Sequence, residues 1–192
     1  MTISPANAET YISVDVETAG PNPSQYSLLA IGASCVFLPE QNFYVELKPV
    51  NLLFQAEALE SCGFSLEKLA VEGADPAEAM HRFEGWLKEL LPSGQRPVFV
   101  GFNAPFDWMF VNDYFHRYLG HNPFGYSAID IKSYYMGMAK VTWSETTMQY
   151  LGKRYLNRPA LIHHALKDAL DQGEIFQKIL LESAGQPVES KP

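Results

Sequence analysis

The chain of 192 residues is long enough for one compact domain with a substantial core. Apolar residues make up 47% and charged residues 19%, a balance typical of globular proteins. The formal net charge of −8 argues against a protein that coats nucleic acid nonspecifically, because phosphate binding depends on Lys and Arg.

The sequence contains no apolar run long enough for a transmembrane helix. The first ten residues lack the basic and apolar regions of a signal peptide. Two cysteines, Cys35 and Cys62, are too few for a disulfide framework and lack the spacing of metal ligands, so we expect buried thiols. These features predict a cytoplasmic protein without a membrane partner.

Basic residues are unevenly distributed along the chain. Between Lys132 and Lys167 there are six bases and a single acid, Glu145. One face of an acidic protein could therefore be positive and contact a polyanion. A solvated basic face with no partner fits the composition equally well.

The first third of the chain predicts three antiparallel strands. Residues 11–16 read Y-I-S-V-D-V, residues 28–38 form a longer apolar run, and residues 42–47 alternate between apolar and polar. The turn between the second and third strands is expected at residues 39–42, P-E-Q-N. Residues 49–75 show no clear pattern.

Helices and strands alternate after residue 75. Asp75 is the expected N-cap, and Pro76 the first residue, of a helix that ends near Leu91. Residues 97–101, P-V-F-V-G, have the continuous apolar character of a buried strand. Further elements are predicted in this order: a helix over 106–119, a strand over 126–129, small helices over 132–138 and 145–151, and a final helix. The pattern predicts one α/β domain over residues 1–182 and a polar tail over 183–192.

Three short segments carry acids where elements begin or end. Asp15 and Glu17 end the first strand and point the same way, because alternate strand residues share a face. Asp107 stands at the start of a helix, and Asp168 lies beside the apolar stripe of the last helix. Taken singly, each has an ordinary explanation as a solvated strand end, a helix-capping residue or a solvated helix acid. Together, four carboxylates are enough to hold a pair of divalent ions about 4 Å apart, as phosphodiester hydrolysis requires.

The order of these segments resembles the DEDD-type 3′–5′ exonucleases of the histidine subclass. D-x-E at a strand end is followed by N-x-x-F-D at a helix start and by H-x-x-x-x-D at the final helix. The stretches D-V-E-T-A-G (15–20) and L-G-H-N-P-F (119–124) look most like ribonuclease T. The resemblance implies a ribonuclease H-like fold, with a five-stranded mixed sheet flanked by helices and the acids at one edge.

The resemblance also implies roles for the matching residues. Asp15 is expected to bridge two Mg²⁺ ions, for which Mn²⁺ could substitute. Glu17 and Asp168 are expected to hold the ion that activates water, and Asp107 the second ion. His163 is the expected general base, since an imidazole with a pKa of about 6.5 suits that role at working pH. His164 is its competitor, because it could share a helix face with Asp168.

Contacts to the terminal nucleotide are expected from the matching positions Thr18, Ala19, Asn103 and Phe106. A structural role for Phe106 is at least equally open. Asp130, at the end of the predicted 126–129 strand, is a candidate for supporting the site from behind.

The resemblance implies hydrolysis of single-stranded nucleic acid from a free 3′ end, with RNA favoured and nucleoside 5′-monophosphates released. A DNA proofreading or repair exonuclease is the alternative, although C-G-F-S (62–65) replaces the H-G-I-T of proofreading enzymes. An inactive nucleic-acid-binding module is the alternative from another class, and loss of a ligand acid or of the histidine would be its sign. All five residues are present in the sequence. Because related exonucleases pair, a homodimer is expected.

Overall fold

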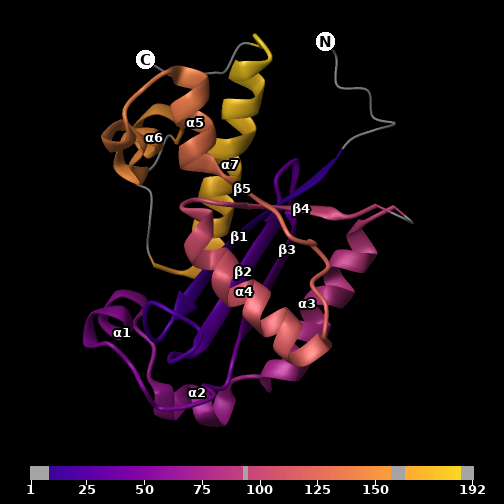
Figure 1. Ribbon diagram of the computed structural model, residues 1–192, viewed down its shortest axis with the longest axis vertical. Helices are drawn as coiled ribbons and strands as arrows, with labels where there is room; N and C mark the ends of the chain where they lie inside the picture. Colours follow the sequence, from indigo (N-terminus) through magenta and orange to yellow (C-terminus); the bar gives the residue numbers. More distant parts are fainter. Residues whose placement is uncertain (1–8, 93–94, 157–162, 187–192) are drawn as a thin grey trace.

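A computed structural model describes residues 9–92, 95–156 and 163–186 of the protein. Five strands form one mixed sheet in the order β3-β2-β1-β4-β5 (Figure 1). β1 (Thr10–Thr18), β2 (Leu28–Cys35) and β3 (Leu38–Glu46) form an antiparallel meander. β4 (Pro97–Gly101) pairs in parallel with β1, and β5 (Ala128–Asp130) pairs in parallel with β4. The predicted five-stranded mixed sheet is confirmed.

The hairpin between β2 and β3 differs from the prediction. Its turn lies at residues 36–37, whereas the expected turn at residues 39–42 falls inside β3. Proline usually marks a turn, and the prediction relied on that preference. β3 is an edge strand, where a missing backbone N–H costs no ladder hydrogen bond if it faces outward. Pro39 is therefore accommodated within the strand, and the expected turn was wrong.

The helices follow the predicted order, except that the helix expected over 145–151 is replaced by a 3₁₀ helix over 143–146 and an α-helix over 148–155. Asp75 caps α3 as expected, since its Oδ1 accepts a hydrogen bond from the backbone N–H of Ala77 at 2.9 Å. Two short helices occupy the stretch whose pattern was unclear. The helices are α1 (Ala56–Cys62), α2 (Leu66–Glu72), α3 (Pro76–Leu90), α4 (Ala104–Leu119), α5 (Ile131–Ala139), the 3₁₀ helix η2 (Trp143–Thr146), α6 (Met148–Tyr155) and α7 (Ala165–Ser183). Within the predicted polar tail, residues 187–192 lie outside the described part of the chain.

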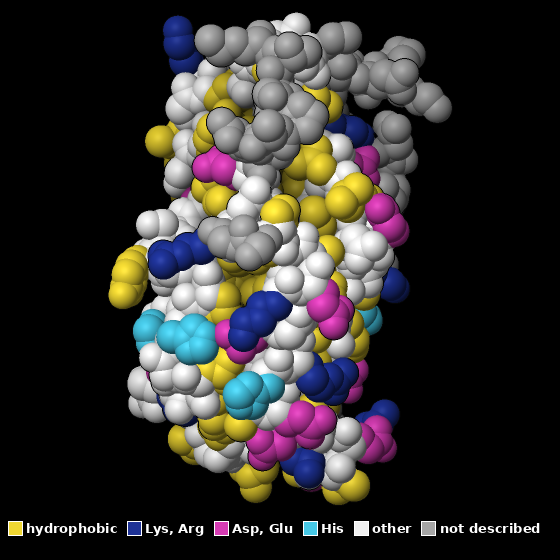
Figure 2. Space-filling model, turned by 90° about the vertical axis from the view of Figure 1, so that its right-hand side faces the viewer, with side chains coloured by type: hydrophobic (Ala, Val, Ile, Leu, Met, Phe, Trp, Pro, Cys, Tyr) yellow, Lys and Arg dark blue, Asp and Glu magenta, His cyan; other side chains and the backbone are white. Residues whose placement is uncertain are grey.

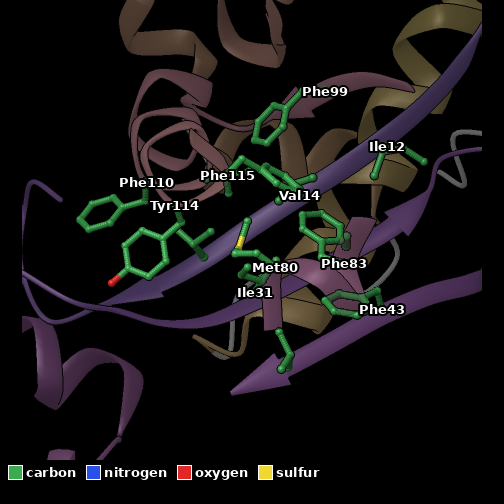
Figure 3. Packing of buried hydrophobic residues seen from close by; sticks show 14 of the residues in the cluster. Ile12, Val14, Ile31, Phe43, Met80, Phe83, Phe99, Phe110, Tyr114 and Phe115 are labelled. Atoms are coloured by element: carbon green, nitrogen blue, oxygen red, sulfur yellow. The ribbon is translucent and has the colours of Figure 1, made fainter. Parts of the chain in front are cut away.

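One face of the sheet is covered by α3 and α4. Alternate residues of β1, namely Ile12, Val14 and Val16, join the aromatic core on this face. The ring of Phe83 stacks on that of Phe43, with centroids 4.9 Å apart, and the two lie together over the sheet in Figure 3. The hydroxyl of Tyr114 accepts a hydrogen bond from the N–H of Leu28 at 2.9 Å, which ties α4 to the start of β2.

The opposite face is covered by α7, which lies directly on β1 and β2 because two glycines remove the intervening side chains. A Cβ on Gly32 would lie 2.1 Å from the backbone carbon of Ala165, and one on Gly173 would lie 3.3 Å from Cβ of Ser13. Gly32 pairs with Asp15 across the β1–β2 ladder. This close approach therefore brings the start of α7 beside Asp15.

Figure 2 shows the side of the molecule on which α3 lies. Basic, acidic and histidine side chains are intermixed there, so this side presents no broad field of one charge. Among the described residues, no helix combines the length and apolar character needed to cross a membrane.

Candidate active site

Three carboxylates converge at the carboxyl end of β1. One oxygen from each of Asp15, Glu17 and Asp168 lies within 4.8 Å of the other two. Asp15 and Glu17 share a face of β1, and Asp168 lies in the first turn of α7. The close packing of α7 on Gly32 supplies the third member of the cluster from a distant part of the sequence.

The fourth predicted acid, Asp107, lies beside this cluster. It is buried in the first turn of α4, and its Oδ1 accepts a hydrogen bond from the N–H of Val16 at 3.0 Å. Val16 stands between Asp15 and Glu17 on β1. The hydrogen bond therefore joins Asp107 to the strand segment that carries the other acids.

Burial and like charge raise the pKa values of these carboxyl groups. For Asp15, burial and then the charges of Asp107, Asp168 and Glu17 raise the pKa well above its usual range. Burial, followed by the charge of Asp168, raises the pKa of Glu17 to about 7. Burial raises the pKa of Asp107 to about 8, although hydrogen bonds from backbone N–H groups oppose the shift.

Ionised acids buried this close together destabilise the folded state unless cations compensate their charge. A donor set made only of carboxylate oxygens suits the hard divalent cations Mg²⁺ and Mn²⁺. The four acids therefore fit a divalent metal centre.

The two histidines before α7 have different surroundings. His163 is exposed and has a left-handed backbone, with φ of 48°. His164 is the N-cap of α7, and its ring stacks on Tyr44 with centroids 4.9 Å apart. Asp168 accepts a hydrogen bond from the backbone N–H of His164 at 3.2 Å, so these residues meet through a helix cap. Packing thus holds the ring of His164, whereas His163 faces outward.

The predicted nucleotide contacts after β1 lie next to the acids. Thr18 is buried, and its hydroxyl donates to the carbonyl of Gly20 at 2.9 Å. Ala19 is also buried; its N–H donates to the carbonyl of Ser27, and its carbonyl accepts from the N–H of Gln55. Both backbone groups of Ala19 are therefore already hydrogen-bonded inside the protein.

The other two predicted contacts lie at the start of α4. Asn103 is exposed and takes the N-cap position in a left-handed conformation, with φ of 67°. Phe106 is half-buried, packs against the core under α4 and contacts the ring of Phe110 at 5.5 Å. The structure thus gives Phe106 a packing contact, in addition to any contact with substrate.

Gln172 is a supporting residue that the sequence analysis missed. Its side chain is only 1% exposed, its Oε1 accepts from the N–H of Phe102, and its Nε2 donates to the carbonyl of Val14 at 3.0 Å. One amide thereby links three segments: β1, the loop that precedes α4, and α7 itself. The acids lie on β1, α4 and α7. The available signal was a polar residue within the apolar stripe, one turn after Asp168.

Asp130, the candidate for supporting the site from behind, contacts the starts of two helices. Its Oδ2 accepts from the N–H of Ala104 at 2.9 Å, and its Oδ1 accepts from the N–H of Ser133 at 2.8 Å. The same carboxylate therefore caps α5 and anchors the start of α4, close to Asp107.

A mixed five-stranded sheet with an acid cluster at the carboxyl end of its central strand defines a ribonuclease H-like nuclease. The sequence matches the exonuclease family called RNase T over residues 12–176, and the chain belongs to this family. It is 47% identical over 171 residues to the 3′–5′ DNA exonuclease Cap18 of Escherichia coli, covering 89% of this chain and 91% of that protein. Ribonuclease T of Citrobacter koseri is 32% identical over 126 residues, which span 59% of this chain and 58% of the relative.

Solved structures share the fold. The nuclease domain of 3′hExo, a DEDDh family member bound to rAMP, superposes with a TM-score of 0.74 at 15% identity, covering 98% of this chain and all of that one. The complex of E. coli exonuclease I with single-stranded DNA has a TM-score of 0.69 at 17% identity, covering 93% of this chain and 41% of that one. The predicted ribonuclease H-like fold and the predicted resemblance to DEDD-type 3′–5′ exonucleases are confirmed.

Proposed function

We propose that this exonuclease removes nucleoside 5′-monophosphates from the 3′ end of single-stranded DNA, with two divalent cations held by Asp15, Glu17, Asp107 and Asp168. The observation that carries the proposal is the approach of three carboxylates within 4.8 Å, with Asp107 hydrogen-bonded to the same strand. Such a cluster is stable at neutral pH when cations balance its charge.

Each of the four acids has its own proposed role as a metal ligand. In this proposal Asp15 would be a ligand of both ions, Glu17 and Asp168 would hold the ion on the water side, and Asp107 would hold the second. When bound, a pair of Mg²⁺ or Mn²⁺ ions stabilises charge at the attacking and leaving oxygens of the displacement. The backbone N–H of Val16 keeps Asp107 oriented toward this centre.

His163 acts as the general base that takes the proton from the attacking water. It is exposed directly before α7, five residues from Asp168, and is therefore accessible to a bound substrate. The ring of His164 is engaged with Tyr44, which favours His163 for this role. Thr18, Ala19, Asn103 and Phe106 remain the proposed contacts to the terminal nucleotide. Asn103 is exposed and Phe106 half-buried, whereas Thr18 and Ala19 are buried.

DNA is the preferred substrate in this proposal because the relative with 47% identity, Cap18, is a DNA exonuclease. RNA is the second candidate, since ribonuclease T is 32% identical and the D-V-E-T-A-G segment resembles it. The RNA preference expected from the sequence remains a prediction. A protein distinguishes the two polymers through the 2′-hydroxyl.

The test is a digest of 5′-labelled single-stranded DNA and RNA of one sequence, with Mg²⁺, Mn²⁺ or EDTA. A ladder that shortens from the 3′ end, requires metal and disappears in Asp15→Asn supports the exonuclease site. The DNA-to-RNA rate ratio assigns the substrate, and chromatography identifies the released nucleotide. Binding without cleavage of either polymer, under both metals, would favour the inactive nucleic-acid-binding module.

We also propose a cytoplasmic homodimer, as expected from the pairing of related exonucleases. The outer part of edge strand β3, residues 38–42, is exposed, and an uncovered edge is one surface through which copies of a chain can pair. Light scattering at micromolar concentration should give twice the 21.5 kDa of the chain. A mass of one chain would reject the dimer.

A further inference from the structure

Trp143, on η2, is an exposed aromatic residue with a cation above its ring. Its side chain is 51% exposed, and the Nζ of Lys132 lies 3.9 Å from the ring centroid. No carboxylate of the described residues lies within salt-bridge distance of this ammonium group. The pair therefore offers a positive charge and an indole surface to the solvent.

The pair lies at the same edge of the sheet as the acids. β1, β4 and β5 are parallel, so their carboxyl ends meet at one edge. α5 begins directly after Asp130, the last residue of β5, and Lys132 is the second residue of α5. Asp130 in turn anchors the start of α4, the helix that carries Asp107. A short chain of contacts thus connects the Lys132–Trp143 pair to the acid cluster, on the side of the site where α5 and α6 lie (Figure 1).

The charge around the pair is complementary to a polyanion. Over residues 132–156 the described chain contains Lys132, Lys140, Lys153 and Arg154. Arg154 pairs with Glu182, whereas none of the three lysines forms a salt bridge with a described residue. The nearby acid Glu145 is turned back onto its own segment, where it accepts hydrogen bonds from the N–H and hydroxyl of Thr142.

Resting on the proposed function, we propose that Lys132 and Trp143 form a subsite for the part of a single DNA strand that lies 5′ of the terminal nucleotide. The ammonium group of Lys132 contacts a backbone phosphate, and the indole face not covered by Lys132 stacks on a base. Every base has an aromatic face, so such a subsite tolerates any sequence. Its purpose is to hold strands of several nucleotides while the acids act at the 3′ end.

Substrate length provides the test. We compare steady-state hydrolysis of an oligo(dT) of about fifteen nucleotides with that of a dinucleotide. The longer strand is long enough to span a typical single-strand binding surface, whereas the dinucleotide is too short. Trp143→Ala should raise KM for the long strand by about tenfold with kcat unchanged, and leave kcat/KM for the dinucleotide unchanged. Trp143→Phe should restore most of the affinity. Phe37→Ala is the matched control, since Phe37 is an exposed aromatic in the β2–β3 turn at the opposite edge of the sheet.

Lys132→Gln tests the phosphate contact separately. The dependence of log affinity on log salt for the long strand should fall by roughly 0.7, the value for one lost phosphate contact on a single strand. Lys132→Arg should retain the wild-type slope. An unchanged slope in Lys132→Gln would remove the phosphate contact from the proposal.

Binding without hydrolysis separates this inference from the proposed function. Fluorescence anisotropy of 5′-labelled oligo(dT) in Ca²⁺ should show about tenfold weaker binding by Trp143→Ala. If the wild type cleaves nothing but this loss of binding appears, the exonuclease assignment fails and the subsite stands. If cleavage is normal but both KM and anisotropy are unaffected, the subsite is rejected. Equal effects on long strand and dinucleotide, or a change of oligomeric mass, would also overturn it and assign Trp143 to folding or to contacts between copies.

Discussion

Gln172 donates a hydrogen bond from its Nε2 to the carbonyl oxygen of Val14 at 3.0 Å, across 158 residues of sequence. Val14 immediately precedes Asp15, and Gln172 lies one turn after Asp168. The other end of the same amide accepts from Phe102, ahead of α4. The acids are therefore positioned by a buried polar contact as well as by apolar packing.

Replacing Gln172 by Met should lower both stability and turnover. Met has a similar volume but cannot satisfy the N–H of Phe102 or the carbonyl of Val14, and each buried unsatisfied group costs about 1–3 kcal/mol. Urea unfolding should report the loss of stability. Titration with Mn²⁺ should show weaker metal binding by the folded variant. Gln177→Met, at a half-buried position of the same helix, is the control. Wild-type metal affinity in Gln172→Met would mean that Gln172 serves the fold alone.

Asp15→Asn should abolish turnover and leave the fold intact. The substitution removes the charge of the central acid while changing little volume. It should also stabilise the metal-free protein, because it relieves repulsion among Asp15, Asp107 and Asp168. Hydrolysis assays and thermal unfolding in EDTA measure the two effects. Glu72→Gln, an exposed acid on α2, is the control. Activity above about a tenth of wild type would contradict the bridging role, given that lost metal chemistry costs orders of magnitude.

His163→Ala should slow hydrolysis by about 10²–10⁴-fold, the usual contribution of a general base. His164→Ala should affect turnover far less. It should instead lower thermal stability, since the stacking on Tyr44 is worth about 0.5–1.5 kcal/mol. Measuring kcat and the melting temperature for both variants decides the assignment. If His164→Ala were the slower enzyme, the base would be His164.

The stability of the metal-free protein should fall as pH rises from about 4 to about 8. Folding raises the pKa of Glu17 to about 7 and of Asp107 to about 8, so the folded state binds more protons than the unfolded chain in this range. Stability decreases with pH wherever the folded state holds the extra protons. Thermal unfolding in EDTA across this range checks the direction. Added Mg²⁺ should stabilise the protein more at pH 8 than at pH 5, because protons compete for the carboxylates. A pH-independent effect of Mg²⁺ would argue against these ligands.

Many local features were predictable from neighbouring residues. The cap of α3 by Asp75 and the bounds of β4 follow from short patterns that act within a few residues. The side chains of Asp15 and Glu17 point to the same face of β1, which follows from strand alternation alone. The turn after β2 was placed wrongly because the preference of Pro39 for turns was overridden by the edge position of β3, which is a tertiary property.

The sequence by itself determined which acids are present, their order, and the elements that carry them. Only the tertiary structure decided that Asp168 reaches Asp15 and Glu17, because this depends on α7 packing against Gly32. It also decided that His164 is held by Tyr44 and that Gln172 joins three acid-bearing segments. Such contacts span distant parts of the chain, and no local pattern of residues encodes which surfaces meet when the core closes.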